Sequence, residues 1–222
     1  MAKEIADIIS VPAFIADPPV VDEFCPLARL SGLPEISRTA VFHALNHKAA
    51  ARRAAKAMGT RYEAANFIVC HVGSGATIGA HRKGRVIDAN NALDGEGPFT
   101  PERSGGLPLL GFVEMCYSGN LSLEEIKKKL VGQGGLMAYL GTNSAVEVER
   151  RIAEGDEYAA LVYEAMAYQI AKEIGAQATV LKGDIDAIII TGGVAYSEML
   201  VEWIKARVEF IAPVMVYPGE DE

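Results

Sequence analysis

The sequence has few cysteines and lacks long apolar segments. Its three cysteines, Cys25, Cys70 and Cys116, are widely spaced and include no CxxC pair, so they indicate neither a zinc site nor a disulfide framework. Apolar runs such as Phe67–Cys70 and Ala187–Ile190 are too short to span a bilayer, and the N-terminal segment MAKEIADIIS lacks the apolar core of a signal peptide. These absences predict an intracellular, cytoplasmic protein.

An excess of positive charge is missing as well. Lys and Arg number 21 against 29 Asp and Glu, and the net charge is -8. This balance argues against nucleic acid or an anionic membrane surface as the partner. It does not exclude a phosphate ligand, because anion sites depend on local backbone amides and a few cations. With 222 residues, of which 50% are hydrophobic, the chain can bury the core of one large domain or two small ones.

Helical and strand-like segments alternate along the chain. Apolar residues at helical intervals and cap signals predict the helices, whereas short β-rich runs predict the strands. The helix expected at 156–181 has one apolar face, made of Leu161, Ala165, Tyr168, Ile170 and Ile174. Helices are predicted at 1–10, 37–58, 123–130, 144–154, 156–181 and 197–207, and strands at 12–17, 186–191 and 214–217.

Turn and loop signals cluster in the middle of the chain. The strand-turn-strand block NFIVCHVGSGATIGAHRKGRVIDANN contains Lys83-Gly84, a strong hairpin signal. The segment 91–109 carries Gly and Pro throughout, which predicts an ordered loop. Loops of this length usually serve a functional site.

Two glycine turns follow short apolar strands. In His71–Thr77 (HVGSGAT), two glycines leave room for a phosphate to approach the backbone amides, and Ser74 and Thr77 add hydroxyl donors. In Thr191–Ser197 (TGGVAYS), a pair of glycines lies between a strand and a helix, which suits the approach of a phosphate or nucleotide. Either segment could instead be a tight turn that merely needs small residues.

Other polar side chains are candidates for chemistry. His43 and His47 are four residues apart on one predicted helix face, but no third zinc ligand is evident, so His43 is either a buried structural histidine or a donor to a transition-state oxygen. Arg103 offers a planar fork of donors for phosphoryl or carboxylate oxygens, unless it is a surface arginine. Asp22 and Glu23 follow two valines and could bind magnesium or cap a helix.

The order of these segments resembles butyrate kinase. The resemblance covers the chain from about Val11 onward, and that family belongs with acetate kinase in the acetate and sugar kinase, heat-shock chaperone and actin superfamily. It implies an α/β fold of ribonuclease H-like (actin-like ATPase) lobes, each a mixed β-sheet flanked by helices, with ATP and an acid meeting in a cleft. The seven matching blocks are FHALNHKAAARRAA, HVGSGATIGAHRKGRVIDANNALDGEGPF, PERSGGLP, YLGTN, AMAYQIAKEIGA, IIITGGVAYSEMLVEWI and VYPGEDE.

The resemblance also implies roles for individual residues. HVGSGAT matches the family's second phosphate motif and the Gly192-Gly193 turn its adenosine motif, whereas the segment 142–144 departs from the Asp-Phe/Leu-Arg pattern of acetate kinase relatives. His43 and Arg103 would stabilise the transferring phosphoryl group, and Asp22 would position magnesium or the carboxylate. Glu220 or Glu222 would supply a further acid for the metal. The residues expected near the nucleotide are His71, Gly73, Ser74, Gly75, Thr77, Asn143, Gly192, Gly193, Val194, Tyr196 and Ser197.

The reaction implied by the resemblance is transfer of the γ-phosphate of ATP, with Mg²⁺, to butanoate, which gives butanoyl phosphate and ADP. Acetate, propionate or isobutyrate are alternative acceptors, because one methylene changes binding by only about 1 to 3 kcal/mol. Two further hypotheses involve no catalysis: a module that only binds a nucleotide, and a folded remnant that binds nothing.

The resemblance covers only part of such an enzyme. We expect residues 1–24 to be the remnant of an N-terminal lobe and residues 25–222 to be the C-terminal nucleotide-binding lobe without its terminal helix. A cleft enzyme that lacks one wall cannot exclude water, so the chain alone is expected to have little activity. Relatives form dimers or larger oligomers, so a homo-oligomer is expected of the intact enzyme.

Overall fold

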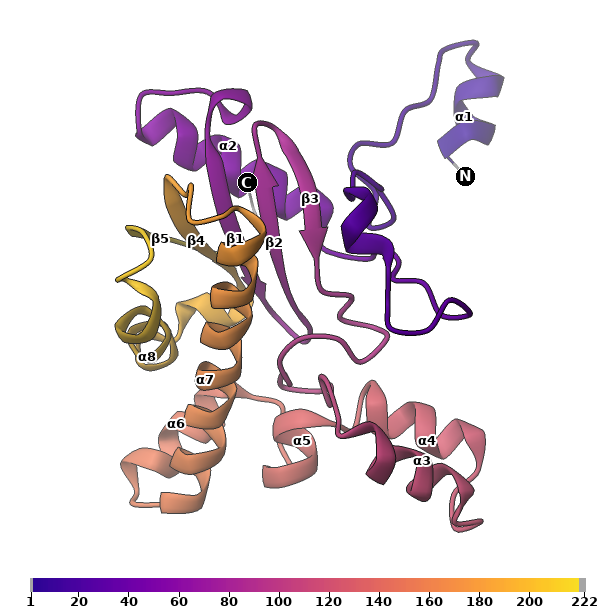
Figure 1. Ribbon diagram of the computed structural model, residues 1–222, viewed down its shortest axis with the longest axis vertical. Helices are drawn as coiled ribbons and strands as arrows, with labels where there is room; N and C mark the ends of the chain where they lie inside the picture. Colours follow the sequence, from indigo (N-terminus) through magenta and orange to yellow (C-terminus); the bar gives the residue numbers. More distant parts are fainter. Residues whose placement is uncertain (1, 220–222) are drawn as a thin grey trace.

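A mixed β-sheet forms the centre of the molecule (Figure 1). The computed structural model describes residues 2–219, and within them the sheet has five strands in the order β3-β2-β1-β4-β5. β1 pairs antiparallel with β2, and β2 with β3, whereas β1, β4 and β5 run parallel. The parallel strands therefore end at one edge of the sheet. The strands are β1 (Asn66–Val72), β2 (Ala76–Arg82), β3 (Arg85–Ala89), β4 (Ala187–Gly192) and β5 (Val214–Pro218).

Helices cover both faces of this sheet. The alanines of α2 (Ala44–Ala57) pack against Phe67 and Val69 of β1, whereas Ile68 and Cys70 of the same strand pack with α7 (Glu157–Val180) and α8 (Glu198–Val208). Successive strand residues point to opposite faces, and every residue of β1 is buried because helices cover both of these faces.

The hairpin and the strands β4 and β5 agree with the sequence predictions. Lys83 and Gly84 have φ angles of 47° and 86°, and two successive residues with positive φ are the requirement of a tight type I′ hairpin turn. The runs predicted as strands at 186–191 and 214–217 form β4 and β5. The long loop that follows β3 continues to Pro108, as expected.

The helical predictions are correct for most elements and wrong in their details for others. α4 (Leu123–Leu130), α6 (Ala145–Ala153), α7 and α8 are confirmed. The predicted face of α7 is wrong in part, because Leu161 and Tyr168 are 65% and 51% exposed while Ile170 and Ile174 are buried. α3 (Leu109–Tyr117) and α5 (Gly135–Leu140), which extend below the sheet in Figure 1, were not predicted.

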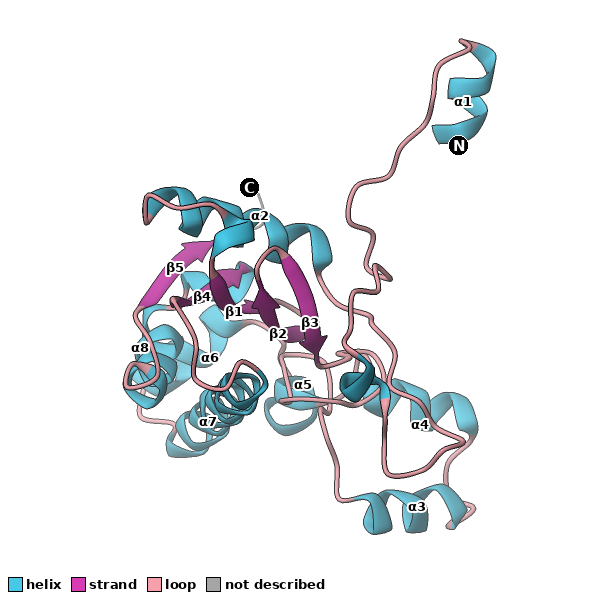
Figure 2. Ribbon diagram, turned by 45° about the horizontal axis from the view of Figure 1, so that its top comes forward, coloured by secondary structure: helices cyan, strands magenta, loops and turns pink. Residues whose placement is uncertain are grey.

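The N-terminal segment departs most from the predictions. α1 (Ala2–Ile8) is confirmed, and it lies at the end of an extended arm away from the sheet (Figure 2). The strand predicted at 12–17 is wrong: no described strand pairs with it, and a strand needs a neighbour to satisfy its backbone groups. The helix predicted from residue 37 begins only at Ala44, because residues 37–43 are held by side-chain and backbone contacts to other segments.

Across residues 2–219, none of the helices combines the length and the apolar character that crossing a membrane requires.

Candidate active site

The two glycine turns lie side by side at the carboxyl ends of neighbouring parallel strands. His71 near the end of β1 pairs with Thr191 of β4. Gly192 has φ 91° and ψ 172°, and a Cβ atom there would lie 2.5 Å from the carbonyl oxygen of Val72. Only glycine allows this backbone conformation and this close approach of the two strands.

Both turns border one cavity of about 320 Å³, which we call the glycine-turn cavity. Gly73 and Ser74 come from the turn after β1, and Gly193 and Val194 come from the short 3₁₀ helix η3 (Gly193–Tyr196) after β4. Ligands of open α/β sheets bind in the crevice beyond the carboxyl ends of parallel strands. The cavity is lined by Gly73, Ser74, Pro101, Glu102, Asn143, Gly193 and Val194.

A second, smaller cavity of about 150 Å³ lies across the first glycine turn, and we call it the arginine pocket. Its polar lining comes from His43, Thr77 and Arg103, and the rest is apolar. A small pocket with an apolar wall and a few convergent polar groups suits a short organic acid. It is lined by Pro19, Val41, Phe42, His43, Thr77, Ala92, Leu93 and Arg103.

Arg103 lines the arginine pocket and reaches over the first glycine turn. Its guanidinium lies over Gly75, where a Cβ atom would come within 2.2 Å of Nη1, and that nitrogen donates to the carbonyl oxygen of Ala92 at 3.2 Å. Within residues 2–219 it forms no ion pair, and burial lowers its pKa. A half-buried guanidinium without a carboxylate partner can bind a phosphoryl or carboxylate oxygen.

The histidines beside this pocket are held neutral by burial. The rings of His43 and His71 stack with their centroids 3.7 Å apart. Burial, followed by the charge of Arg103, lowers the pKa of His43 to about 4, and burial followed by the neighbouring His43 lowers the pKa of His71 to about 3. His43 therefore enters any reaction near pH 7 as a neutral hydrogen-bond donor or acceptor.

We expect stability to fall as the pH is lowered from 7 to 5.5. The unfolded chain takes up protons on its histidines near pH 6.5, while the folded protein keeps them neutral, so acid favours unfolding by about 1 kcal/mol for each such histidine. Urea denaturation at the two pH values measures this. Burial raises the pKa of Glu173, so this residue stabilises the folded protein as the pH falls, which is the opposite effect. A Glu173→Gln variant should therefore still lose stability on acidification. Equal stabilities at the two pH values would contradict the prediction.

Comparison with known proteins assigns a family to this chain. The model of the acetokinase family matches residues 35–212. The chain belongs to the acetokinase family. That match spans both glycine turns, Arg103 and His43. It confirms the wider family of acetate and butyrate kinases and does not distinguish butyrate kinase within it.

Solved structures of acetokinase relatives share the fold. The acetate kinase of Porphyromonas gingivalis is 23% identical with a TM-score of 0.82, over 91% of this chain and 59% of its own. A propionate kinase from Francisella tularensis subsp. tularensis is 24% identical with a TM-score of 0.78, over 89% of this chain and 58% of its own. The acetate kinase of Entamoeba histolytica is 17% identical with a TM-score of 0.78, over 90% of this chain and 60% of its own. The expected ribonuclease H-like, actin-like ATPase fold is confirmed, and the chain spans about three fifths of the length of these enzymes.

The expected nucleotide residues of this acetokinase-family chain divide into groups. The glycine-turn cavity is lined by five of them: Gly73, Ser74, Asn143, Gly193 and Val194. Gly192, at the end of β4, is in close contact with the backbone of Val72 at the end of β1. Gly75 lies under the guanidinium of Arg103, and the other expected residues, His71, Thr77, Tyr196 and Ser197, do not line this cavity.

Tyr196 and Ser197 do not line the glycine-turn cavity. The 3₁₀ helix turns Tyr196 outward, where its side chain is 68% exposed. Ser197 is buried as the N-cap of α8, where its Oγ accepts from the backbone N–H of Leu200 at 3.0 Å and contacts Tyr163 and Glu149. Its hydroxyl therefore stabilises the helix start.

His71 and Thr77 both contact His43, which lines the arginine pocket. Thr77 Oγ1 lies 2.9 Å from His43 Nδ1 and lines the arginine pocket. His71 is buried beneath the first turn, and its Nδ1 lies 2.7 Å from the side-chain oxygen of Asn46. Asn46 was not predicted from the sequence, although its position three residues after His43 on the same predicted helix was a usable signal.

The residues expected to bind magnesium do not assemble a site in the described part of the chain. The carboxylate of Asp22 accepts from the guanidinium of Arg29 and from the backbone N–H of Phe24 at 3.2 Å, which lowers its pKa. Glu220 and Glu222 lie outside the described residues. Among residues 2–219, no group of three His, Cys, Asp or Glu side chains is arranged to hold a metal ion.

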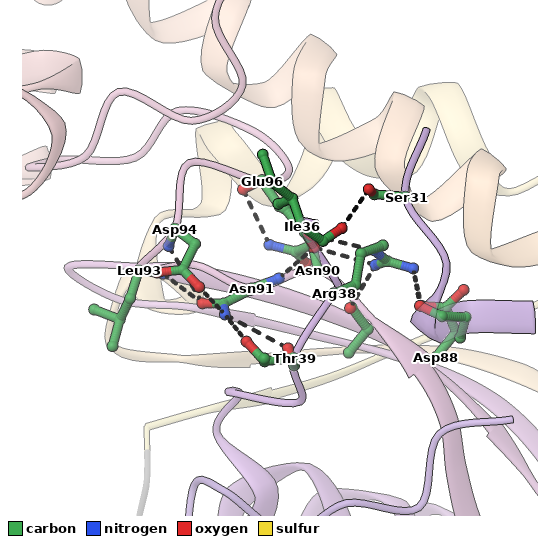
Figure 3. A network of polar contacts seen from close by, with 12 residues as sticks. Ser31, Ile36, Arg38, Thr39, Asp88, Asn90, Asn91, Leu93, Asp94 and Glu96 are labelled. Carbon is green, nitrogen blue, oxygen red and sulfur yellow. Dashed lines mark hydrogen bonds and ion pairs between the residues drawn. The ribbon is translucent and has the colours of Figure 1, made fainter. Parts of the chain in front are cut away.

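A polar network fixes the loop beside the arginine pocket (Figure 3). Arg38 donates from Nε and Nη2 to the carboxylate of Glu96, at 3.1 Å for each pair of atoms. Glu96 also accepts from the backbone N–H of Asn91 at 2.9 Å. The network thereby positions the carbonyl oxygen of Ala92, which accepts from Arg103.

We expect Arg38→Ala to lower the unfolding free energy by about 2 kcal/mol, because Asp88 and Glu96 lose their half-buried cationic partner. Chemical denaturation measures the loss. Arg52→Ala is the matched control: its side chain is 53% exposed and lies 3.8 Å from Asp17, so its removal should change stability by less than about 0.5 kcal/mol. Equal effects of the two substitutions would contradict a structural role for Arg38.

Proposed function

We propose that this chain carries the nucleotide and acceptor sites of an ATP-dependent carboxylate kinase whose acceptor is butanoate. The glycine-turn cavity holds the nucleotide phosphates, and the arginine pocket holds the acid. The expected catalytic group is Arg103 together with His43, and the family membership of the chain supports this reaction class.

The observation that carries the proposal is the arrangement of the two cavities around one turn. Ser74 lines the glycine-turn cavity and Thr77 lines the arginine pocket, while Arg103 lies over Gly75 between them. A phosphoryl group that leaves one cavity for the other therefore passes the guanidinium. Phosphoryl transfer depends mainly on positioning and charge neutralisation, which this arrangement supplies.

The chemistry follows from these positions. A carboxylate oxygen of the acid attacks the γ-phosphorus of ATP, the bond between that phosphorus and the β–γ bridging oxygen breaks, and the electron pair leaves with ADP. The acid retains the phosphoryl group as butanoyl phosphate. Arg103 neutralises charge on the transferring oxygens, and neutral His43 donates a hydrogen bond to one of them.

Butanoate is supported by sequence blocks and by the lining of the arginine pocket. NNALDGEGPF and PERSGG resemble the butyrate kinase segments more than those of acetate kinase. The pocket adds the apolar side chains of Val41, Phe42 and Leu93 for an alkyl chain. Acetate and propionate are the alternative acceptors, because the relatives with solved structures are acetate and propionate kinases.

Two measurements test the proposal in sequence. Calorimetry with ATP and Mg²⁺ tests the nucleotide site, and acid-dependent ADP release with acetate, propionate, butanoate and isobutyrate tests transfer and specificity. We expect ATP binding and, within the low turnover expected of the chain alone, the highest rate with butanoate. Binding without acid-dependent ADP release from any acid would support a nucleotide-binding module instead, and the absence of ATP binding would overturn the proposal.

A further inference from the structure

A continuous chain of hydrogen bonds runs behind the arginine pocket from Tyr62 to His43. Tyr62 Oη lies 2.8 Å from His81 Nδ1, and His81 Nε2 lies 3.2 Å from His47 Nδ1. His47 Nε2 and His43 Nδ1 each lie 2.9 Å from the hydroxyl oxygen of Thr77. The chain links α2, β2 and the 3₁₀ helix η2 (Tyr62–Ala64) to the pocket.

Each histidine in this chain carries a single ring proton. Burial lowers the pKa of His81 to about 3 and the pKa of His47 well below its ordinary value. Their neighbour His43 is neutral for the same reason. A neutral imidazole has one N–H donor and one acceptor nitrogen. Once one ring nitrogen is known to donate, the other must accept, and this determines which atom donates in the next hydrogen bond.

The backbone carbonyl oxygen of Thr77 fixes the direction of the whole chain. It lies 3.2 Å from His47 Nε2, and a carbonyl oxygen can only accept, so Nε2 of His47 carries the proton. Nδ1 of His47 is then an acceptor, which requires His81 to donate from Nε2. His81 Nδ1 in turn accepts from the hydroxyl of Tyr62, which completes one consistent set of donors and acceptors.

The same logic continues toward the pocket. The hydroxyl oxygen of Thr77 accepts from His47 Nε2 and, at 3.5 Å, from the backbone N–H of His43. Its own hydrogen is left for Nδ1 of His43 at 2.9 Å. With Nδ1 accepting, the single ring proton of His43 belongs on Nε2.

We infer that Thr77 and His47 are positioning residues that hold His43 in the Nε2–H tautomer, so that its proton is available to an oxygen of the transferring phosphoryl group. The role of that proton rests on the proposed function, whereas the tautomer does not. Gly79 supports the arrangement, because a Cβ atom there would lie 3.2 Å from His47 Nδ1 and crowd the ring.

Nitrogen NMR on the chain labelled at histidine tests the tautomer directly, because protonated and unprotonated ring nitrogens have distinct shifts. We expect Nε2–H for His43 in the natural sequence and in Thr77→Ser, which keeps the hydroxyl. In Thr77→Val, the donor to Nδ1 is lost and His43 should populate both tautomers. Nδ1–H on His43 in the natural sequence, or an unchanged His43 in Thr77→Val, would overturn the inference.

Tyr62→Phe controls for general loosening of the buried network. It removes a buried hydroxyl but leaves the contacts of Thr77 in place, so His43 should keep its tautomer. A mixture of tautomers in Tyr62→Phe as large as that in Thr77→Val would overturn the specific role of Thr77.

A kinetic measurement separates this inference from the proposed function. If Nε2–H is the competent form, kcat falls in proportion to its population, so equal tautomer populations should halve kcat and leave the KM for the acid unchanged. A variant with mixed tautomers but full kcat would overturn the catalytic use of the proton. A chain with the expected tautomer that binds no ATP would instead contradict the proposed function and leave the positioning role intact.

Discussion

Gly192→Ala is expected to lower the unfolding free energy by about 4 kcal/mol and to abolish ATP binding. Gly192 has φ 91° and ψ 172°, a conformation that costs other residues about 1 to 3 kcal/mol. An alanine Cβ would also lie 2.5 Å from the carbonyl oxygen of Val72 and 2.9 Å from its backbone carbon and nitrogen. These atoms belong to the neighbouring strand, so β1 and β4 must separate at the edge that forms the cavity. Urea denaturation and calorimetry with ATP measure the two effects.

Gly193→Ala is the matched control for this substitution. Its φ is not in the left-handed region, and a Cβ atom there would meet no protein atom within 4 Å. The unfolding free energy of the Gly193→Ala variant should therefore differ from that of the natural sequence by less than about 1 kcal/mol. Equal stability losses in the two variants would contradict the close approach of the strands as the reason for glycine at position 192.

Gly75→Ala is expected to reduce acid-dependent ADP release by about 100-fold to 1,000-fold, the range seen when one transition-state donor is removed. An alanine Cβ would lie 2.2 Å from Nη1 and 2.6 Å from Cζ of Arg103, so the guanidinium must leave its position over the first glycine turn. The backbone of Gly75 needs no positive φ, and the end of an arginine side chain moves easily. Stability should therefore stay within about 1 kcal/mol, as denaturation can verify.

A double-mutant cycle with Arg103→Ala isolates this effect. If Gly75→Ala acts by displacing Arg103, the double variant should be no less active than Arg103→Ala alone. Multiplied losses in the double variant would mean that the glycine acts independently, for example through the phosphates. This result would contradict the role assigned to the guanidinium.

Local signals in the sequence predicted the elements that form the nucleotide end of the sheet. β4 is a short apolar run that ends in a glycine pair, and the hairpin after β2 contains Lys83-Gly84. Both signals act over a few residues, so neither requires knowledge of the tertiary fold. They sufficed to predict two glycine turns, and the pairing of β1 with β4 brings these turns together.

Elements whose stability depends on distant contacts were predicted poorly. Residues 12–17 have an apolar run, but no strand within residues 2–219 pairs with it, so the run forms no strand. α3 (LLGFVEMCY) is apolar on nearly every side and none of its residues is buried, so it lacks the alternation of an apolar and a polar face by which helices are recognised. α7 is apolar on several sides, and spacing alone could not show that Ile170 rather than Leu161 faces the sheet.

The candidate site shows the same division. Glycines at turns and Arg103 in a Gly/Pro-rich loop carry local signals, and they line the two cavities. The network behind His43 comes from a helix, one strand and a 3₁₀ helix, so it could not be inferred from spacing. Asp22 was predicted from its position after two valines and from the resemblance, neither of which shows that its carboxylate accepts from the guanidinium of Arg29.

Amide NMR during titration with ADP tests whether the turns after β1 and β4 bind one nucleotide together, on which the proposed function depends. We predict that the backbone signals of Gly73, Ser74, Gly75, Gly192 and Gly193 shift along binding curves with one shared dissociation constant. Shifts confined to one of the two turns, or two different dissociation constants, would contradict a shared nucleotide site.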